Sequence, residues 1–135
     1  MTIPFHAGRI RALLFFLVAL DVVLGSCALA SPETWFRLFH GRAYADPAGL
    51  MRRAGAIWAA FALLETLALL RWKKEPWWLV LVAGMRLSEF FADWVHLAMA
   101  ERVTLWGGVG LAVSPVFNAC AGWFLIRAYR GTERR

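Results

Sequence analysis

Four ionisable residues lie on one face of a predicted helix in the segment Arg86-Leu-Ser-Glu89-Phe-Phe-Ala-Asp93-Trp-Val-His96. At about 100° per residue, the four side chains fall within an arc of about 80°. With a rise of about 1.5 Å per residue, they form a ladder about 15 Å long. Two carboxyl groups beside a histidine and an arginine can take up or release a proton, or bind a cation or a polar ligand.

The ladder lies inside a long apolar segment, residues 77–100. In water it would be an ordinary solvated face. In a membrane, a charged side chain near the bilayer centre costs several kcal/mol unless it is buried and partnered. The elements around the ladder therefore decide which chemistry it can support.

Composition predicts a membrane protein. The 135 residues are 61% hydrophobic and 18% charged, whereas a soluble domain is less apolar and more highly charged. The net charge of +6 lies mostly beside apolar blocks, where it sets orientation, so nucleic-acid binding is not expected. Cys27 and Cys120 have no metal-binding or redox spacing and are interpreted as packing residues.

The apolar blocks are long enough to cross a bilayer. The predicted fold is a single all-α domain, residues 1–135, made of a polytopic membrane bundle of four transmembrane helices with a short interfacial helix between the first two. The spans are residues 10–30, 50–72, 77–100 and 105–129, and the interfacial helix is residues 32–40. Ser31-Pro32-Glu33 predicts the start of that helix, with Ser31 as its cap, and Gly41 its end.

The first span also resembles a cleavable signal, because Arg9 and Arg11 precede it and Ala28-Leu29-Ala30 ends it. Asp21 interrupts its apolar core, so the segment is retained as a helix. Basic residues indicate that both termini are cytoplasmic, with nine on the inner side and five on the outer side. The inner residues are Arg9, Arg11, Arg71, Lys73, Lys74, Arg127, Arg130, Arg134 and Arg135. The outer residues are Arg37, Arg42, Arg52, Arg53 and Arg102.

Each predicted span carries a strong polar group at a similar depth, and these groups should face inward. The candidate site residues for a ligand or a proton are Glu89, Asp93, His96, Arg86, Asp21, Glu65 and Asn118. The four carboxyl groups outnumber the one arginine, so some should be protonated or should bind a cation or a ligand. No metal site and no resident cofactor are predicted, although His40 and His96 at one depth would allow a metal or a haem, and a quinone or another lipid would suit the site.

A purely structural interpretation stays open. The same groups could simply hold the helices together, with an Arg86–Glu89 ion pair and a hydrogen bond between Asn118 and Asp21. Small residues at the start of the fourth span predict close helix contact, or room for a flat apolar ligand. They are Gly107, Gly108, Gly110 and Ser114, with the four-residue spacing of Gly110-x-x-x-Ser114.

The layout resembles that of the DoxX-like small bacterial inner-membrane proteins: four helices, a helix start at Ser31-Pro32-Glu33, a loop, and then Leu50-Met51-Arg52-Arg53-Ala54-Gly55. The resemblance implies a bacterial inner-membrane location and an association with redox or quinone-linked complexes. The set Glu89, Asp93 and His96 is also similar to the carboxylates and histidine of sterol-isomerase-like membrane proteins.

Three functions remain open. The leading hypothesis is a non-enzymatic accessory or scaffold subunit in a larger membrane complex. The second is a site that binds or transports an apolar ligand, a proton or a cation. The third is an intramembrane isomerase-like enzyme that uses Glu89, Asp93 and His96. Expected partners are the lipid bilayer and other membrane subunits or further copies of the chain.

Overall fold

The computed structural model describes residues 7–100 and 103–133, and this part of the chain is entirely helical apart from its loops. Arg102, Arg134 and Arg135, which entered the charge count above, lie outside the described residues. The helices are α1 (Ala7–Ala30), α2 (Pro32–His40), α3 (Leu50–Arg71), α4 (Trp77–Met99) and α5 (Leu105–Glu133). The all-α class predicted from the sequence is confirmed.

Three of these helices, α1, α3 and α5, are long and apolar enough to cross a membrane. The predicted membrane character is therefore confirmed at this level. Helix α4 is also long, with 23 residues, but it carries Arg86, Glu89 and Asp93.

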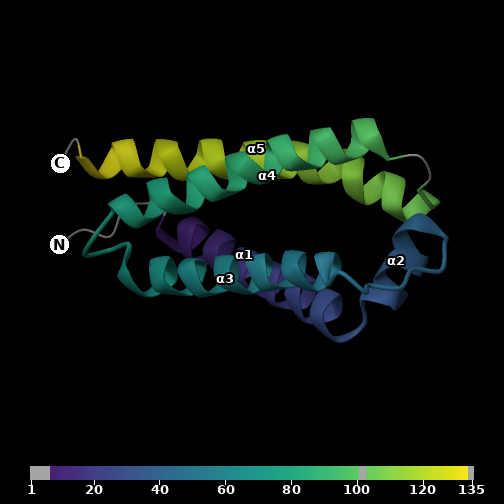
Figure 1. The fold of residues 1–135 in the computed structure, drawn as a ribbon. Helices are drawn as coiled ribbons and strands as arrows, with labels where there is room; N and C mark the ends of the chain where they lie inside the picture. Colours follow the sequence, from purple (N-terminus) through teal and green to yellow (C-terminus); the bar gives the residue numbers. More distant parts are fainter. Residues whose placement is uncertain (1–6, 101–102, 134–135) are drawn as a thin grey trace.

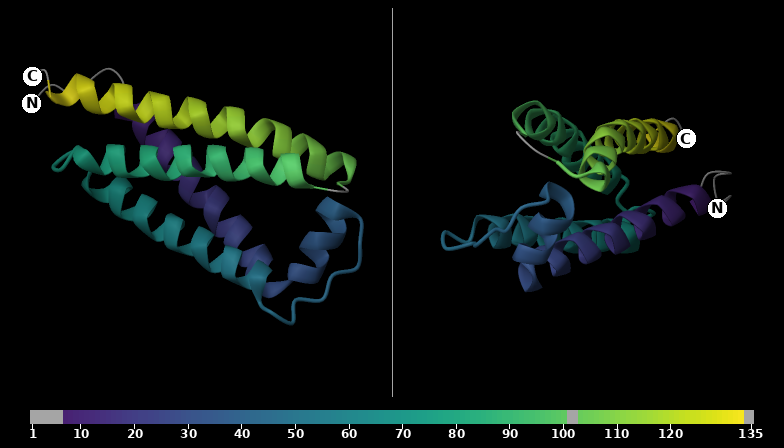
Figure 2. Two further views of the ribbon diagram at one scale, coloured as in Figure 1. Left: turned by 45° about the horizontal axis from the view of Figure 1, so that its top comes forward. Right: turned by 90° about the vertical axis from the view of Figure 1, so that its right-hand side faces the viewer.

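The long helices form two pairs. Helix α1 packs along α3, and α4 packs along α5, so that the pairs lie one above the other (Figures 1 and 2). Small residues allow the close approach within each pair. A Cβ atom on Gly25 of α1 would lie 3.0 Å from the carbonyl oxygen of Gly55 in α3, and one on Gly122 of α5 would lie 3.3 Å from that of Ala83 in α4. Of the glycines predicted to allow close helix contact at the start of α5, Gly107 does so against the Phe39 backbone of α2, whereas a Cβ on Gly110 would meet nothing within 4 Å.

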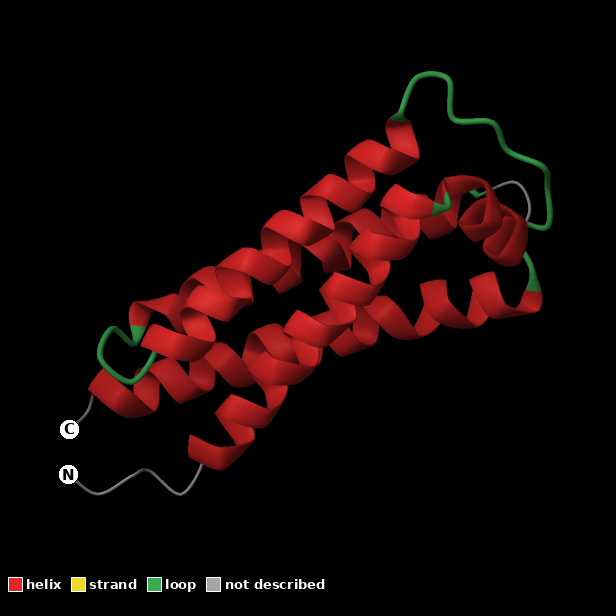
Figure 3. Cartoon of the chain, turned by 90° about the horizontal axis from the view of Figure 1, so that it is seen from below, coloured by secondary structure: helices red, strands yellow, loops and turns green. Residues whose placement is uncertain are grey.

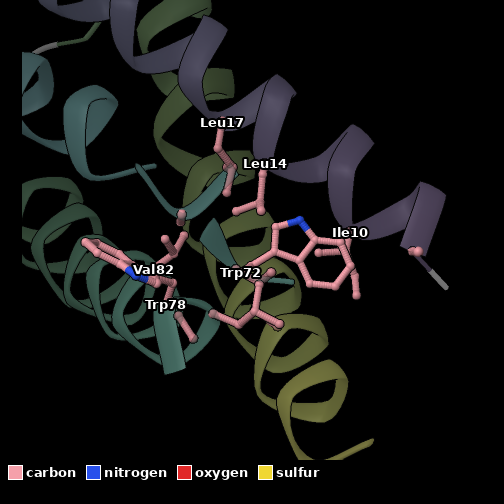
Figure 4. Packing of buried hydrophobic residues seen from close by; sticks show 11 residues of the cluster. Ile10, Leu14, Leu17, Trp72, Trp78 and Val82 are labelled. Atoms are coloured by element: carbon pink, nitrogen blue, oxygen red, sulfur yellow. The ribbon is translucent and has the colours of Figure 1, made fainter. Parts of the chain in front are cut away.

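An apolar core joins the two pairs at the end of the molecule that holds both termini (Figures 1 and 4). Ile10, Leu14 and Leu17 of α1 point toward Trp72, and Trp78 and Val82 of α4 belong to the same cluster (Figure 4). These side chains pack closely between the two helix pairs, and this packing fixes the register of one pair against the other at this end.

The other end is closed by α2 and the loop that follows it (Figure 3). Pro32 begins α2 and Gly41, with φ of 66°, ends it as predicted, but the Ser31 hydroxyl makes no capping hydrogen bond. The Thr104 amide donates to the Phe39 carbonyl at 2.9 Å, which ties the end of α2 to the start of α5.

Candidate functional site

Arg86 joins three helices at the middle of the molecule. Its guanidinium donates hydrogen bonds to the carboxylates of Asp21 on α1 and Glu65 on α3. A second hydrogen bond to Asp21 runs from Arg86 Nη1 to Asp21 Oδ1 at 3.4 Å. The exposed fractions are 0% for Asp21 and Glu65 and 3% for Arg86. Pairing makes such charges tolerable in an apolar interior, although Glu65 Oε2 and Arg86 Nε make no hydrogen bond within the described part of the chain.

The predicted ion pair between Arg86 and Glu89 is therefore wrong. The two residues are neighbours on one helix face, but the guanidinium extends across to the α1–α3 pair. Asp21 and Glu65 reach the same guanidinium from two helices because α1 and α3 pack together along their length. With two carboxylates on one arginine, this cluster keeps one formal negative charge when all three groups are ionised.

A second polar cluster occupies the half of the molecule nearer α2. Glu89 accepts a hydrogen bond from the indole Nε1 of Trp58 at 3.5 Å. Asp93 accepts one from the Ser114 hydroxyl at 2.5 Å and one from Asn118 Nδ2 at 3.2 Å. The predicted hydrogen bond between Asn118 and Asp21 is wrong, because α5 packs on α4 and presents Asn118 to Asp93.

The second cluster is rich in acceptors. Glu89 and Asp93 are half-buried. Their hydrogen-bond donors carry no charge, and neither carboxylate forms an ion pair within residues 7–100 and 103–133. Asn118 is 4% exposed, and its Oδ1 accepts no hydrogen bond from the described part of the chain. Oxygen acceptors without a positive partner suit a proton, a cation or a ligand that donates hydrogen bonds.

Aromatic rings cover the end of this cluster. The ring centroids of Trp58 and Trp35 of α2 lie 5.5 Å apart, and those of Trp35 and Phe39 lie 4.5 Å apart. His96 is exposed, and its ring lies 5.5 Å from that of His40 at the end of α2. The predicted proximity of these two histidines is therefore present. Within the described part of the chain, no hydrogen bond or ion pair joins His96 to Glu89 or Asp93.

Two contributors to the second cluster were not identified from the sequence as site residues. Trp58 precedes Glu65 by seven residues, so both lie on one face of α3, and this spacing was the available signal. Ser114 precedes Asn118 by four residues and shares its face of α5. Ser114 thus joins the same cluster as Asn118, whereas Trp58 joins the second cluster although Glu65 belongs to the first.

Asp46 anchors the loop between α2 and α3, outside the long helices. Its buried carboxylate accepts hydrogen bonds from the amides of Met51 and Arg52 and from the Tyr44 hydroxyl, and it pairs with the Arg52 guanidinium at 3.2 Å. Burial alone would raise the pKa of Asp46, but the amide hydrogen bonds, the hydroxyl and the guanidinium together lower it.

Within the described residues, no three His, Cys, Asp or Glu side chains gather in a way that could hold a metal ion. Comparisons with protein-family models, curated proteins and solved structures find no match to this chain. The geometry of the two polar clusters is therefore the basis for a functional proposal.

Proposed function

We propose that this chain is a membrane protein with four spans that binds a proton or a small cation at Glu89 and Asp93. In this arrangement α4 is the fourth span, and its charged face is enclosed between the α1–α3 pair and α5. The observation that carries the proposal is the unequal sharing of charge: Arg86 is taken by Asp21 and Glu65, which leaves Glu89 and Asp93 with uncharged donors alone. In a membrane interior, two such carboxyl groups need a proton or a cation.

The neighbours of the pair support a binding role. Ser114 and Asn118 can turn their oxygen atoms toward a cation or donate to a carboxylate, because a hydroxyl and an amide do both. Trp58 holds Glu89 by its indole N–H. The quinone or lipid expected from the sequence is the alternative ligand for the same acceptors, and an isomerase would use the same carboxyl pair.

Carboxyl infrared spectroscopy tests the proposal. Difference spectra of the purified protein across pH, with and without sodium chloride, should show a carboxyl C=O band that titrates. The band should weaken in Glu89→Gln and in Asp93→Asn and should disappear in the double variant.

Glu33→Gln is the matched control, because Glu33 is a half-exposed carboxylate on α2. Spectra of the double variant identical to those of the wild type would contradict the proposal. A salt-dependent band indicates a cation, and a salt-independent band a proton.

A second candidate function is the accessory subunit predicted from the sequence. The observation that favours it is the large aromatic surface that α4 and the start of α5 leave exposed, with Phe91 at 67%, Trp94 at 48% and Trp106 at 68%. Aromatic residues are enriched where proteins meet. Purification in mild detergent should then retain partner subunits, and Glu89→Gln should not release them. Recovery of a lone, monodisperse chain would oppose this function.

A further inference from the structure

An open groove of about 690 Å³ runs along α4, lined on that helix from Trp77 to Ser88 and flanked by Tyr129 of α5. Its lining is apolar apart from two hydroxyl groups. Gly84 forms part of its floor, where a Cβ atom would meet nothing within 4 Å. The groove residues are about 180° around the helix from Arg86, so the groove lies on the face of α4 opposite the polar clusters.

The groove has the length of one bilayer leaflet. From Trp77 to Ser88 the helix rises about 17 Å, and the hydrocarbon core of a bilayer is about 30 Å thick. Trp77 stands at the start of α4, where aromatic side chains mark the membrane surface. It is held in place by stacking on Trp78 with centroids 4.5 Å apart, and the Trp78 indole N–H in turn donates to Glu75 at 3.1 Å.

Basic residues are concentrated at the end of the molecule where the groove begins at Trp77. The start of α1, the connection from α3 to α4 and the end of α5 lie at this end of the molecule (Figure 1). The described basic residues there are Arg9, Arg11, Arg71, Lys73, Lys74, Arg127 and Arg130. Glu75 pairs with Arg71 at 3.8 Å, and the two lysines beside it are exposed. This positive charge is complementary to an anionic phosphate at the membrane surface.

We propose that the groove binds one acyl chain of an anionic phospholipid, with its phosphate near Lys73 and Lys74. The acyl chain extends from Trp77 to Ser88 within one leaflet, and the headgroup lies on the side of the two termini. The inference rests on the membrane placement used in the proposed function, but not on the carboxyl pair.

Native mass spectrometry of the detergent-purified protein, with an equimolar mixture of dioleoylphosphatidylglycerol and dioleoylphosphatidylcholine, tests this site. The wild type should retain one phosphatidylglycerol in preference to phosphatidylcholine. Gly84→Leu fills the groove and should lower retention about tenfold, as expected from losing the burial of about two methylene groups. Gly110→Leu is the matched control, because Gly110 also faces open space on a long helix.

The headgroup is tested separately by the double variant Lys73→Gln with Lys74→Gln, which should reduce the preference for phosphatidylglycerol roughly thirtyfold. Equal retention of the two lipids by the wild type, or unchanged retention by a helical Gly84→Leu protein, would overturn the proposal. Glu89→Gln should leave lipid retention unchanged, and Gly84→Leu should leave the carboxyl band unchanged. Failure of the lipid site is thus distinguishable from failure of the cation site.

Discussion

Arg86 illustrates what helical spacing can and cannot predict about a residue. The period of 3.6 residues correctly places Arg86 and Glu89 on one face, and the depths of Asp21, Glu65 and Asn118 correctly indicate buried polar groups. The partner of Arg86 depends instead on how the helices are offset along their axes and on side-chain rotamers. Those quantities follow from packing, which a single sequence does not specify.

Replacing Arg86 should destabilise the protein strongly. Arg86→Met leaves Asp21 and Glu65 buried without a cation, and breaking a buried pair in this way costs about 3–5 kcal/mol in the free energy of unfolding. Thermal unfolding in detergent, monitored by circular dichroism, measures the change in stability. Adding Asp21→Asn and Glu65→Gln to Arg86→Met should recover much of the loss, because no charge is then left unpaired.

The control for Arg86 is Arg71→Met, which removes an exposed member of a surface pair and should change stability by less than about 0.5 kcal/mol. An Arg86→Met protein that unfolds at the wild-type temperature would show that the buried contacts add nothing to stability.

At the scale of elements, α2 and the loop after it form a cover held by short-range polar contacts. Arg52 near the start of α3 pairs with Asp46 of the loop at 3.2 Å and with Glu33 of α2 at 3.6 Å. The limits of α2 could be predicted because Pro32 and Gly41 have strong positional preferences. Its docking depends on Gly107, where a Cβ would clash with the Phe39 carbonyl oxygen. The sequence predicts close contact at Gly107 but not that α2 is the partner.

Asp46 should make the stability of this cover depend on pH. Its pKa in the folded protein is below the usual 3.8, so its carboxylate contributes stability at neutral pH that is lost as the pH falls through the folded value. Asp46→Asn should therefore lower the unfolding temperature near neutral pH, and the difference from the wild type should shrink below pH 3.8. Thermal unfolding across a pH series measures both effects.

Glu33→Gln provides the comparison for Asp46. Glu33 is half-exposed and contacts the same arginine at a longer distance, so its loss should have a smaller effect at every pH. If the difference between Asp46→Asn and the wild type grew on acidification, the assigned role of the Asp46 carboxylate would be wrong.

At the scale of the whole molecule, the sequence predicts which segments are helical but not which helices pair. Hydrophobic blocks and their basic flanks are local features. The pairing of α1 with α3 and α4 with α5 depends on where Gly25, Gly55 and Gly122 permit close approach. This pairing separates the expected single polar core into two clusters, one neutralised in part by Arg86 and one without a cation.

The four-span arrangement makes a prediction that concerns α4 alone. If α4 crosses the membrane, the connection at Lys74 and the end of α5 at Gly131 lie on one side, and the loop at Ala45 lies on the other. If only α1, α3 and α5 cross, Lys74 and Gly131 lie on opposite sides.

Single cysteines at these three exposed positions, in a background with Cys27→Ser and Cys120→Ala, distinguish the two arrangements by labelling of intact cells with a membrane-impermeant maleimide. Ala45→Cys should react in intact cells, whereas Lys74→Cys and Gly131→Cys should react only after permeabilisation, because the excess of basic residues predicts cytoplasmic termini. Reaction of Gly131→Cys but not of Lys74→Cys in intact cells would exclude α4 as a span, and with it the enclosed site at Glu89 and Asp93.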